Sequence, residues 1–365
     1  MPNQYEAILV TGAGGAVGQF AVDECIETSA IVIATDLPGR IPQRFIDHPG
    51  IAVLEADLTT PEGFKELREV AGDFGIEAII NTAAVVDIAQ PWEVVSPVNV
   101  HLVSDLFELG VVLLVDHFVH ISSASIYADQ EDDEVFIREH DPVLGSSPYE
   151  WSKISSEQIL QALVATQSRM KVTVLRPSLI YGPRCRFLGA ALASIPVLLE
   201  KISQVVFGFY GGPRTNWVHC EDVARACVHC MQREDPEDYR VFNVCNTEAP
   251  GFGEVITEHI EAYGLVSMTE IPLPSPAMLR MLKPLLESEL LFDKVLNPTL
   301  DALWSLFGEP SSQILVKVDK EAVPYAFKHT LFSNAALRST GFDFKWSLPK
   351  GIRNTLDWYK RYDWI

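Results

Sequence analysis

The first half of this chain alternates short apolar runs with segments of helical periodicity, and this rhythm constrains the fold more than any other feature. The apolar runs are Ala7–Thr11, Ile31–Asp36, Ile51–Glu55, Ala78–Asn81, His117–Ser122 and Val172–Arg176. The helical segments between them are Val17–Thr28, Gly63–Ala71, Val98–Leu109 and Tyr149–Ser168. Such alternation predicts an α/β fold, in which helices cover both faces of a doubly wound parallel sheet.

The rhythm changes after Pro177, where proline and glycine become frequent, and it resumes only for Asn216–Asn246. A chain of 365 residues exceeds the roughly 250–300 residues at which a single core stops growing. We therefore expect a nucleotide-binding domain of the Rossmann type over 1–178 and 216–246. A smaller, discontinuous substrate lobe is expected over 179–215 and 247–365, where it would close over the cofactor.

Composition excludes several classes of partner. The chain has 49 acidic against 28 basic residues and a net charge of −21, which repels nucleic acid and anionic lipid surfaces. It begins without a secretory signal pattern, and no uncharged apolar run reaches the ~18–20 residues of a membrane span. Six cysteines do not suggest a disulfide scaffold, so the cytoplasm is the expected compartment.

A glycine-rich turn follows the first apolar run. The glycines of the segment TGAGGAVG are spaced G-x-x-G-x-x-G, and the following helix begins near Ala16 and Val17; the three glycines are Gly12, Gly15 and Gly18. Glycine permits a tight turn and lets the backbone approach a pyrophosphate, while the helix N-terminus offers free N–H groups and a positive dipole end. A plain tight turn is the alternative interpretation. The position between strand and helix favours dinucleotide binding.

An acidic residue ends the second predicted strand. Asp36 lies 18 residues beyond Gly18, where a carboxylate can bind both ribose hydroxyls and repels a 2′-phosphate. Asp36 therefore indicates NAD over NADP. Arg40 lies close by and keeps NADP open, because an arginine can accommodate that phosphate.

A tyrosine and a lysine four residues apart are the most informative pair. Tyr149 and Lys153 project from one face of a helix, so an ammonium there would stabilise a phenolate, whose reference pKa is near ~10. Upstream, the serine cluster that contains Ser123 lies at the carboxyl edge of the sheet, where ligands of such folds bind. Alone, the pair would be an ordinary surface pair. With the serines and the glycine turn in this order, it predicts a catalytic site.

Three other patterns have simpler interpretations. Cys227 and Cys230 have the spacing of a zinc site, but they fall on one face of a predicted helix over 221–233, and packing there is the preferred interpretation, so no metal is expected. The acidic stretch Asp129–Asp141 indicates a solvated loop.

Two apolar stripes in the second lobe fit either core-facing helices or an apolar lid or membrane-surface contact. Their residues are Met278, Met281, Leu282, Leu285, Leu286 and Leu290 in a helix over Ala277–Leu291, then Leu300, Leu303, Trp304 and Phe307.

Taken together, the motifs resemble the extended short-chain dehydrogenases/reductases, the superfamily of nucleotide-sugar epimerases and 3β-hydroxysteroid dehydrogenases. The matching segments include TGAGGAVG (11–18), NTAA (81–84), SSASIYA (122–128), YEWSK (149–153), LRPSLIYGP (175–183) and WVHCEDVARA (217–226). The resemblance implies that Tyr149 is the general base or acid, that Lys153 lowers its pKa and holds the nicotinamide ribose, and that Ser123 orients the reacting oxygen. It further implies cofactor contacts for Asp57, Leu58, Ala83, Ala84 and Asn99.

Departures from the pattern bear on the substrate, which is a small molecule in this superfamily. Sugar dehydratases carry an Asp-Glu pair where this chain has Ala124 and Ser125. Epimerases usually have an asparagine at Leu179 and an arginine at Thr215. The residues expected near the substrate are Ser125, Leu179, Arg184 and Arg214.

These departures, with the apolar stripes and the tail, resemble the 3β-hydroxysteroid dehydrogenase branch. The leading hypothesis is hydride transfer between NAD and a secondary alcohol or ketone on a largely apolar, steroid-like substrate. The alternatives are a nucleotide-sugar 4-epimerase or reductase, and a non-catalytic dinucleotide sensor, which would typically lack the Tyr and Lys. By family analogy, we expect a homodimer formed through the helices near 99–110 and 149–168.

Overall fold

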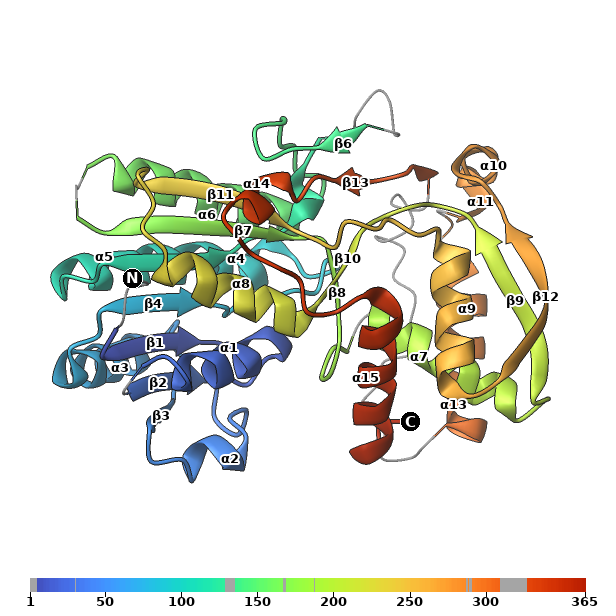
Figure 1. Cartoon of the computed structure of the whole chain (residues 1–365), viewed down its shortest axis with the longest axis horizontal. Helices are drawn as coiled ribbons and strands as arrows, with labels where there is room; N and C mark the ends of the chain where they lie inside the picture. Colours follow the sequence, from blue (N-terminus) through green and yellow to red (C-terminus); the bar gives the residue numbers. More distant parts are fainter. Residues whose placement is uncertain are drawn as a thin grey trace.

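The larger lobe is built on a seven-stranded sheet in which every neighbouring pair is parallel (Figure 1). The strands are β1 (Ala7–Thr11), β2 (Ile31–Asp36), β3 (Ile51–Glu55), β4 (Ala78–Asn81), β5 (His117–Ile121), β7 (Lys171–Pro177) and β11 (Tyr239–Val244). Their order is β3-β2-β1-β4-β5-β7-β11, which confirms the doubly wound prediction. The computed structural model describes residues 5–29, 31–128, 135–166, 169–186, 188–286, 288, 291–308 and 327–365.

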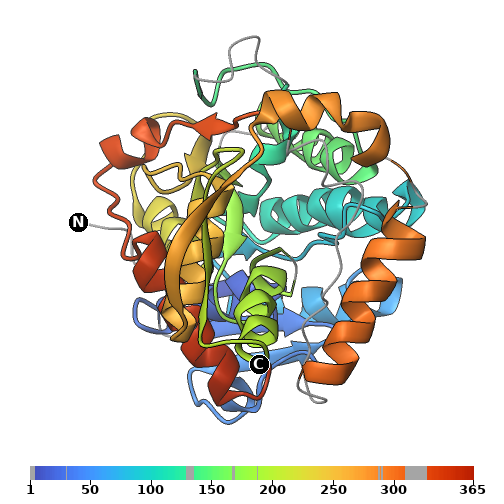
Figure 2. The same cartoon turned by 90° about the vertical axis from the view of Figure 1, so that its right-hand side faces the viewer.

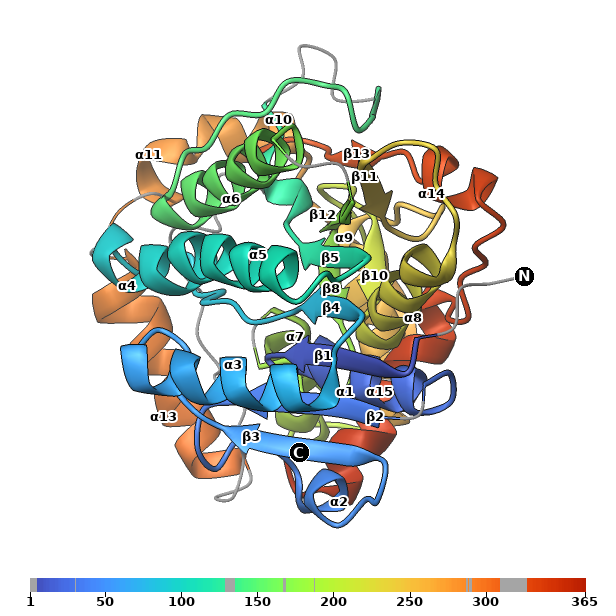
Figure 3. The same cartoon turned by 90° about the vertical axis from the view of Figure 1, so that its left-hand side faces the viewer.

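Helices cover both faces of this sheet, as Figure 3 shows. Strand residues alternate between two cores because successive side chains point to opposite faces. Ile8 and Val10 join one core with α1 and α8, and Leu9 and Ile33 join the other with α3, α5 and α6. These helices are α1 (Ala16–Ile26), α8 (Cys220–Gln232), α3 (Pro61–Phe74), α5 (Leu102–Val112) and α6 (Pro148–Val164).

The smaller lobe has a core of its own, formed by Tyr181, Trp217, Ile260, Ile352 and Tyr359 among others. Its elements are β8 (Leu179–Tyr181), α7 (Leu188–Glu200), β9 (Val205–Gly211), β10 (Trp217–His219), α9 (Phe252–Tyr263), β12 (Val266–Leu273) and α15 (Leu348–Arg361). In Figure 1 the strands of the large sheet point toward this lobe, and Figure 2 views the lobe from outside. The carboxyl ends of the large sheet therefore face the junction of the two lobes.

One expectation about the smaller lobe is wrong. Alternation of strand and helix was expected only for Asn216–Asn246, yet β9, α9 and β12 form a further unit in which the two strands pair in parallel. Most of the residues of β12 are exposed, so the strand lacks the continuous apolar run that marks a buried parallel strand. Glycines in β9 and a proline in β12 weaken the pattern further.

The predicted helix over Ala277–Leu291 is also wrong as a single core-facing element. The structure breaks it into α10 (Pro276–Met281) and α11 (Lys283–Leu286), because Pro284 lacks an N–H and disfavours a helical residue before it. The side chains of Met278, Met281 and Leu282 are exposed. Leu290 lies outside the described residues, as do the side chains of Leu285 and Leu286. Further on, η3 (Phe292–Leu296) leads into α13 (Asn297–Phe307), which has no buried residue.

The C-terminal tail contacts both lobes. β13 (Leu331–Phe332) pairs with β6 (Phe136–Ile137), and α14 (Ala335–Ser339) lies against β11, while α15 belongs to the core of the smaller lobe. All seven strands of the large sheet lie within 1–178 and 216–246. That these two ranges form the nucleotide-binding domain stays a prediction. The second part of the predicted smaller lobe begins at residue 247. Two elements of that part, β13 and α14, nevertheless contact the larger lobe.

One helical stretch is long and apolar enough to cross a membrane by length and composition alone. It is Trp92–Val112, of 21 residues, formed by α4 (Trp92–Ser96), the π-helical turn η1 (Pro97–His101) and α5. About 56% of its most apolar window is buried inside the protein, where the stretch packs on β4 and α6. It is therefore a core helix of the larger lobe.

The cysteine-rich segment folds as the helix α8, with Cys220, Cys227 and Cys230 all buried as free thiols. Packing on one helix face is thus confirmed for this segment. Within the described ranges, no three His, Cys, Asp or Glu side chains gather as a metal site would require. Of the acidic stretch, residues 129–134 lie outside the described residues, and β6 begins shortly after them.

Candidate active site

The glycine turn between β1 and α1 is held against the loop after β4. Gly12 has a φ of +66°, which favours glycine, and a Cβ there would lie 2.7 Å from the backbone nitrogen of Ala83. A Cβ on Gly18 would lie only 2.0 Å from the carbonyl oxygen of Gly12. The turn therefore has no room for side chains at these two positions, as close helix–sheet packing requires.

The helix that follows the turn exposes its N-terminal end to the junction of the lobes. Gly15 is the N-cap of α1 and provides no side-chain cap, and the helix begins at Ala16. The N–H groups of Ala16, Val17 and Gly18 have no carbonyl one turn earlier in the helix, so they can serve an anionic ligand. This geometry fits the pyrophosphate of a dinucleotide.

Asp36 ends β2 beside the glycine turn. Its carboxylate accepts hydrogen bonds from the N–H of Gly14 at 2.8 Å and of Leu37 at 2.7 Å, which hold it next to the turn. Two carboxylate oxygens have further lone pairs for ribose hydroxyls. Arg40 is exposed, and its backbone carbonyl fills the space beside Gly14. The arrangement fits the predicted preference for NAD.

The other predicted cofactor residues lie along the same edge of the sheet. Asp57 follows β3 and accepts from the N–H and hydroxyl of Thr59, and the adjacent Leu58 is buried. The half-buried Ala83 and Ala84 follow β4. Their contacts with a cofactor stay predictions.

Asn99 has a bridging position. It lies in the π-helical turn η1, and its side-chain amide both donates to and accepts from the backbone of Val85, at 2.9 and 2.8 Å. It also donates to the Ser152 hydroxyl at 3.0 Å. Asn99 thereby joins the loop after β4 to α6, and this bridge occupies the amide that was predicted to touch the cofactor.

A capping box fixes the start of α6. The Ser147 hydroxyl accepts from the N–H of Glu150, and the Glu150 carboxylate accepts from the backbone N–H of Ser147 and of Ser146. Pro148 stands at the first helical position, where its missing N–H costs nothing. Tyr149 thus sits in a firmly defined first turn, and Lys153 follows one turn later.

Ser123, Tyr149 and Lys153 come together at the end of β5. The Ser123 hydroxyl hydrogen-bonds with Tyr149, and it also contacts the hydroxyl of Ser125 at 2.9 Å. The Lys153 ammonium donates to the carbonyl of Ile121 at 2.9 Å and lies 5.9 Å from the centre of the Tyr149 ring. The three predicted catalytic residues are therefore one cluster, at the edge of the sheet that faces the smaller lobe.

Burial controls the charges of this cluster. It raises the pKa of the Tyr149 phenol, while the hydrogen bond from Ser123 acts in the opposite direction. It lowers the pKa of the Lys153 ammonium to about 8, against the Glu157 carboxylate, which raises it. In the protein without cofactor, burial therefore raises the pKa of Tyr149, because removal from water penalises the phenolate. The lowering that was expected from Lys153 together with an oxidised nicotinamide stays a prediction.

The predicted substrate-near residues do not all face the same space. Leu179 starts β8 and is 39% exposed. Arg184 has a φ of +69° and lies between the rings of Phe20 and Trp358, 5.6 and 5.2 Å from their centres. Arg214 donates to the carbonyl of Ala249. Arg184 therefore connects α1 to α15, and both arginines are already engaged within the protein.

Sequence reasoning missed an ion pair below Lys153. Glu157 and Arg176 form a bidentate pair, with distances of 2.9 and 2.5 Å, and both side chains are less than a tenth exposed. Arg176 also donates to Tyr127 and to the carbonyl of Glu139. The signal was present, since Glu157 lies four residues after Lys153 on the same helix.

Two further hydroxyls lie at the edge that faces the smaller lobe, one in the predicted serine cluster and one that the predictions missed. Ser122 and Ser178 follow β5 and β7, and their hydroxyls are buried without a hydrogen-bond partner in the described part of the chain. Buried polar groups are normally paired, so these hydroxyls fit a site that takes a polar ligand.

Comparison with known proteins agrees with this site. The model of the NAD dependent epimerase/dehydratase family matches residues 8–245. The uncharacterized protein YbjS of Escherichia coli (strain K12) is 23% identical over 73% of this chain and 78% of its own length. A sterol-4-alpha-carboxylate 3-dehydrogenase (decarboxylating) of Dictyostelium discoideum is 21% identical over 75% of this chain and 82% of its own.

Among solved structures, the fold is similar to that of a UDP-glucose 4-epimerase from Thermotoga maritima, solved with UDP-glucose. The TM-score is 0.70 at 19% identity, with 98% of this chain and 99% of that chain covered. The family match spans the glycine turn, Asp36 and the Ser123, Tyr149 and Lys153 cluster. This chain therefore belongs to the NAD-dependent epimerase/dehydratase family of extended short-chain dehydrogenases and is an NAD-dependent enzyme.

Proposed function

We propose that this enzyme transfers hydride between NAD and a secondary alcohol or ketone on a largely apolar, steroid-like substrate. The observation that carries the proposal is the cluster of Ser123, Tyr149 and Lys153 beside the glycine turn and Asp36. NAD, when bound, would supply the hydride acceptor or donor and, when oxidised, a positive charge. The turn, Asp36 and the N-terminus of α1 would hold it.

The side chains of the cluster divide the remaining work. Ser123, which faces the phenol, orients the substrate oxygen by a hydrogen bond. Tyr149 exchanges a proton with that oxygen, as a base in oxidation and an acid in reduction. Lys153 holds its positive charge against the carbonyl of Ile121, where it stabilises the phenolate more than the phenol. Its lowered pKa, about 8, means that this assistance fades in alkaline solution.

Three features support an apolar substrate. Leu179 stands partly exposed where epimerases usually have an asparagine. A diphosphate is normally bound by arginine side chains that form paired hydrogen bonds with it. Here Arg184 is stacked between two aromatic rings and Arg214 contacts a backbone carbonyl, so both side chains already have partners within the protein. The similarity to a sterol dehydrogenase points the same way.

A nucleotide-sugar 4-epimerase is the second candidate, and the likeness to the Thermotoga maritima epimerase favours it. The same three residues would serve that reaction. The two candidates differ in the ligand that must fit the smaller lobe, a sterol-sized apolar molecule or a nucleotide diphosphate. A purely sensory protein is the weakest alternative, because Tyr149 and Lys153 are both present.

The test combines turnover with binding. Purified enzyme and NAD are incubated with hydroxysteroids, aliphatic alcohols and ketones, and nucleotide sugars, and NADH absorbance is followed, with Tyr149→Phe as the control. Thermal shift in the presence of NAD then compares a 3β-hydroxysteroid with UDP-glucose and UDP. Stabilisation by UDP alone, with no response to any apolar alcohol or ketone, would replace this proposal by the epimerase.

We further propose that the enzyme touches a membrane surface through α10 and the residues after it. Met278, Met281 and Leu282 are exposed, Met281 by 83%, and Arg280 and Lys283 lie among them in a chain that is otherwise acidic. Such a contact would suit a substrate that dissolves in lipid. Co-sedimentation with neutral phosphatidylcholine vesicles should be lost in a Met278→Glu/Met281→Glu variant, and equal sedimentation would contradict the contact.

A homodimer through α4, α5 and α6 is proposed on similar grounds. Trp92 and Trp151 are exposed by 39% and 47%, and both border a surface pocket over α4 and the start of α6. Large exposed aromatic side chains are typical of protein interfaces. Light scattering should give twice the chain mass, and Trp151→Glu should give the monomer; a wild-type monomer would contradict the proposal.

A further inference from the structure

A line of buried polar side chains crosses the large sheet beneath Lys153. The Thr11 hydroxyl lies 2.6 Å from the amide oxygen of Asn81, and the Asn81 nitrogen lies 3.2 Å from Nδ1 of His120. Nε2 of His120 lies 3.1 Å from the Ser156 hydroxyl, which lies 2.9 Å from the carbonyl of Lys153. The first three residues face each other in the register of β1, β4 and β5. The line therefore joins the strand of the glycine turn to the helix of the catalytic lysine.

The last acceptor in this line is the carbonyl of Lys153, and it determines which atom donates in each hydrogen bond. A backbone carbonyl can only accept, so Ser156 donates its single hydroxyl hydrogen to Lys153. Nε2 of His120 must then donate to Ser156, and Nδ1 of the neutral ring must accept from the Asn81 nitrogen. The amide oxygen of Asn81 is left to accept from Thr11. All bonds thus point one way, from the glycine turn toward α6.

The surroundings keep His120 neutral. Burial lowers the pKa of this imidazole well below its ordinary value, and the nearby positive charge of Lys153 lowers it further. Its side chain is almost completely buried, as are those of Thr11, Asn81 and Ser156. A neutral ring in this place has one fixed donor and one fixed acceptor, which a charged ring would not have.

Lys153 is bonded to β5 through both its side chain and its backbone. The ammonium donates to the carbonyl of Ile121, the residue after His120, and the Lys153 carbonyl is bonded through Ser156 to His120 itself. Ser123 follows two residues later. The placement of α6 on β5 thus decides how Lys153 and Tyr149 meet Ser123.

We propose that His120 is a positioning residue, which fixes α6 on β5 as a neutral Nε2–H imidazole and thereby aligns Lys153 with Tyr149 and the cofactor site. It touches neither substrate nor cofactor. The inference rests on the proposed role of Lys153, but the state of the His120 ring can be measured without any substrate.

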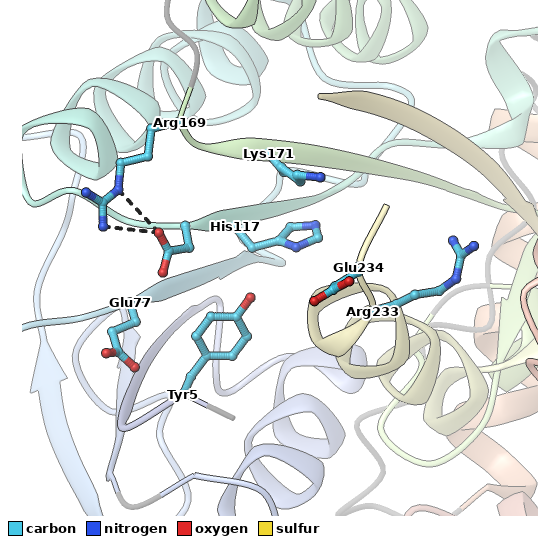
Figure 4. A pocket seen from close by; sticks show the side chains of 8 residues that line it. Tyr5, Glu77, His117, Arg169, Lys171, Arg233 and Glu234 are labelled. Atoms are coloured by element: carbon cyan, nitrogen blue, oxygen red, sulfur yellow. Dashed lines mark hydrogen bonds and ion pairs between the residues drawn. The ribbon is translucent and has the colours of Figure 1, made fainter. Parts of the chain in front are cut away.

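His117 is a matched control on the same strand. It is as buried as His120, and its Nε2 lies 2.9 Å from the hydroxyl of Thr173. It lies at the opposite, amino-terminal edge of the sheet, where it lines a charged pocket of about 330 Å³ with residues such as Lys171 and Arg233 (Figure 4). Replacing His117 should therefore remove a comparable bond without moving Lys153.

The first measurement identifies the tautomer. Long-range proton–nitrogen NMR spectra of ¹⁵N-histidine-labelled enzyme at neutral pH, assigned by comparison with His120→Gln, should show a neutral ring for His120 with its hydrogen on Nε2. A hydrogen on Nδ1 would reverse the direction of the line, and a charged ring would make both ring nitrogens donors; either result would overturn the proposal. This result does not depend on which substrate the enzyme uses.

The second measurement follows NAD affinity and, with a substrate found in the panel above, kcat. His120→Leu and Ser156→Ala should each weaken NAD binding or lower kcat by about tenfold, as expected for loss of a buried hydrogen bond. The double variant should be no worse than the poorer single one, because both break the same line. His120→Gln, which keeps a donor and an acceptor, should recover most of the loss.

The outcomes are distinct. Independent, multiplicative losses in the double variant would show that His120 and Ser156 do not act together, and an equal loss in His117→Leu would reduce His120 to a structural residue. If His120→Leu fails to fold, Ser156→Ala and His120→Gln carry the comparison. Should no alcohol or ketone react, the proposed function fails, whereas the tautomer and the NAD affinities still decide the role of His120.

Discussion

Neutralising Glu157 should weaken the fold and shift the pH dependence of catalysis together. In Glu157→Gln the side chain keeps its shape but loses its charge, so Arg176 stays buried with only part of its hydrogen bonding satisfied. Among the described residues, Arg176 donates two hydrogen bonds to Glu157, one to Tyr127 and one to the carbonyl of Glu139. Breaking a buried pair in this way costs about 3–5 kcal/mol. We expect the lower end, because the amide can still accept one bond.

The effect on catalysis has a defined sign. Burial lowers the pKa of Lys153 to about 8, and the Glu157 carboxylate partly offsets this by stabilising the ammonium. Without that carboxylate the pKa of Lys153 falls further, so the lysine loses its charge at lower pH. The alkaline limb of kcat/KM should therefore move to lower pH in Glu157→Gln.

Urea unfolding at neutral pH measures the first effect, and a pH series with a reactive alcohol measures the second. Arg176→Met/Glu157→Leu is the control, since replacing a buried pair by apolar residues of similar volume is often neutral for stability. That double variant should recover the free energy of unfolding but keep the shifted alkaline limb. A loss below about 1 kcal/mol in Glu157→Gln, or a limb that moves to higher pH, would refute the reasoning.

The remaining predictions concern the cofactor and the chemistry. Asp36 should make NAD bind more tightly than NADP, since a carboxylate repels a 2′-phosphate; titration of both cofactors tests this, and equal affinities would contradict it. Tyr149→Phe should lower kcat by about 10²–10⁴-fold with nearly unchanged NAD affinity, whereas Lys153→Met should impair both, as calorimetry and steady-state rates would show. Gly18→Ala should abolish NAD binding in the same titration, because its Cβ would lie 2.0 Å from the carbonyl oxygen of Gly12 and displace the turn. Wild-type affinity in that variant would mean that the turn does not hold the cofactor.

Much of the larger lobe could be predicted because its strands are buried on both faces. The strand Ala7–Thr11 has the same bounds in the sequence analysis and in the structure, since an unbroken apolar run between turns has few alternatives. The glycine turn and the Tyr149–Lys153 spacing are local patterns, so they too can be read along the chain. Their meeting at one edge follows from the parallel order of the strands.

The rest depends on contacts between distant segments. Nothing local in β12 distinguishes it from a loop, and only its pairing with β9 makes it a strand. The line through His120 requires the register of three strands, and sequence cannot show that Phe20 and Trp358 enclose Arg184. The pKa of Tyr149 likewise depends on burial, which spacing on a helix does not reveal.

The return of the tail to the larger lobe affects how the protein is made. Asn216 accepts from the backbone N–H of Phe332, 116 residues later, and Asn334 donates to the carbonyl of Cys245, which follows the last strand of the sheet. A chain that does not yet include β13 and α14 leaves β6 without its paired strand and β11 without its contact with α14. The nucleotide-binding lobe therefore completes its fold only after residues 331–339 have been made, and a nascent chain stalled before them should bind NAD less tightly than the full sequence.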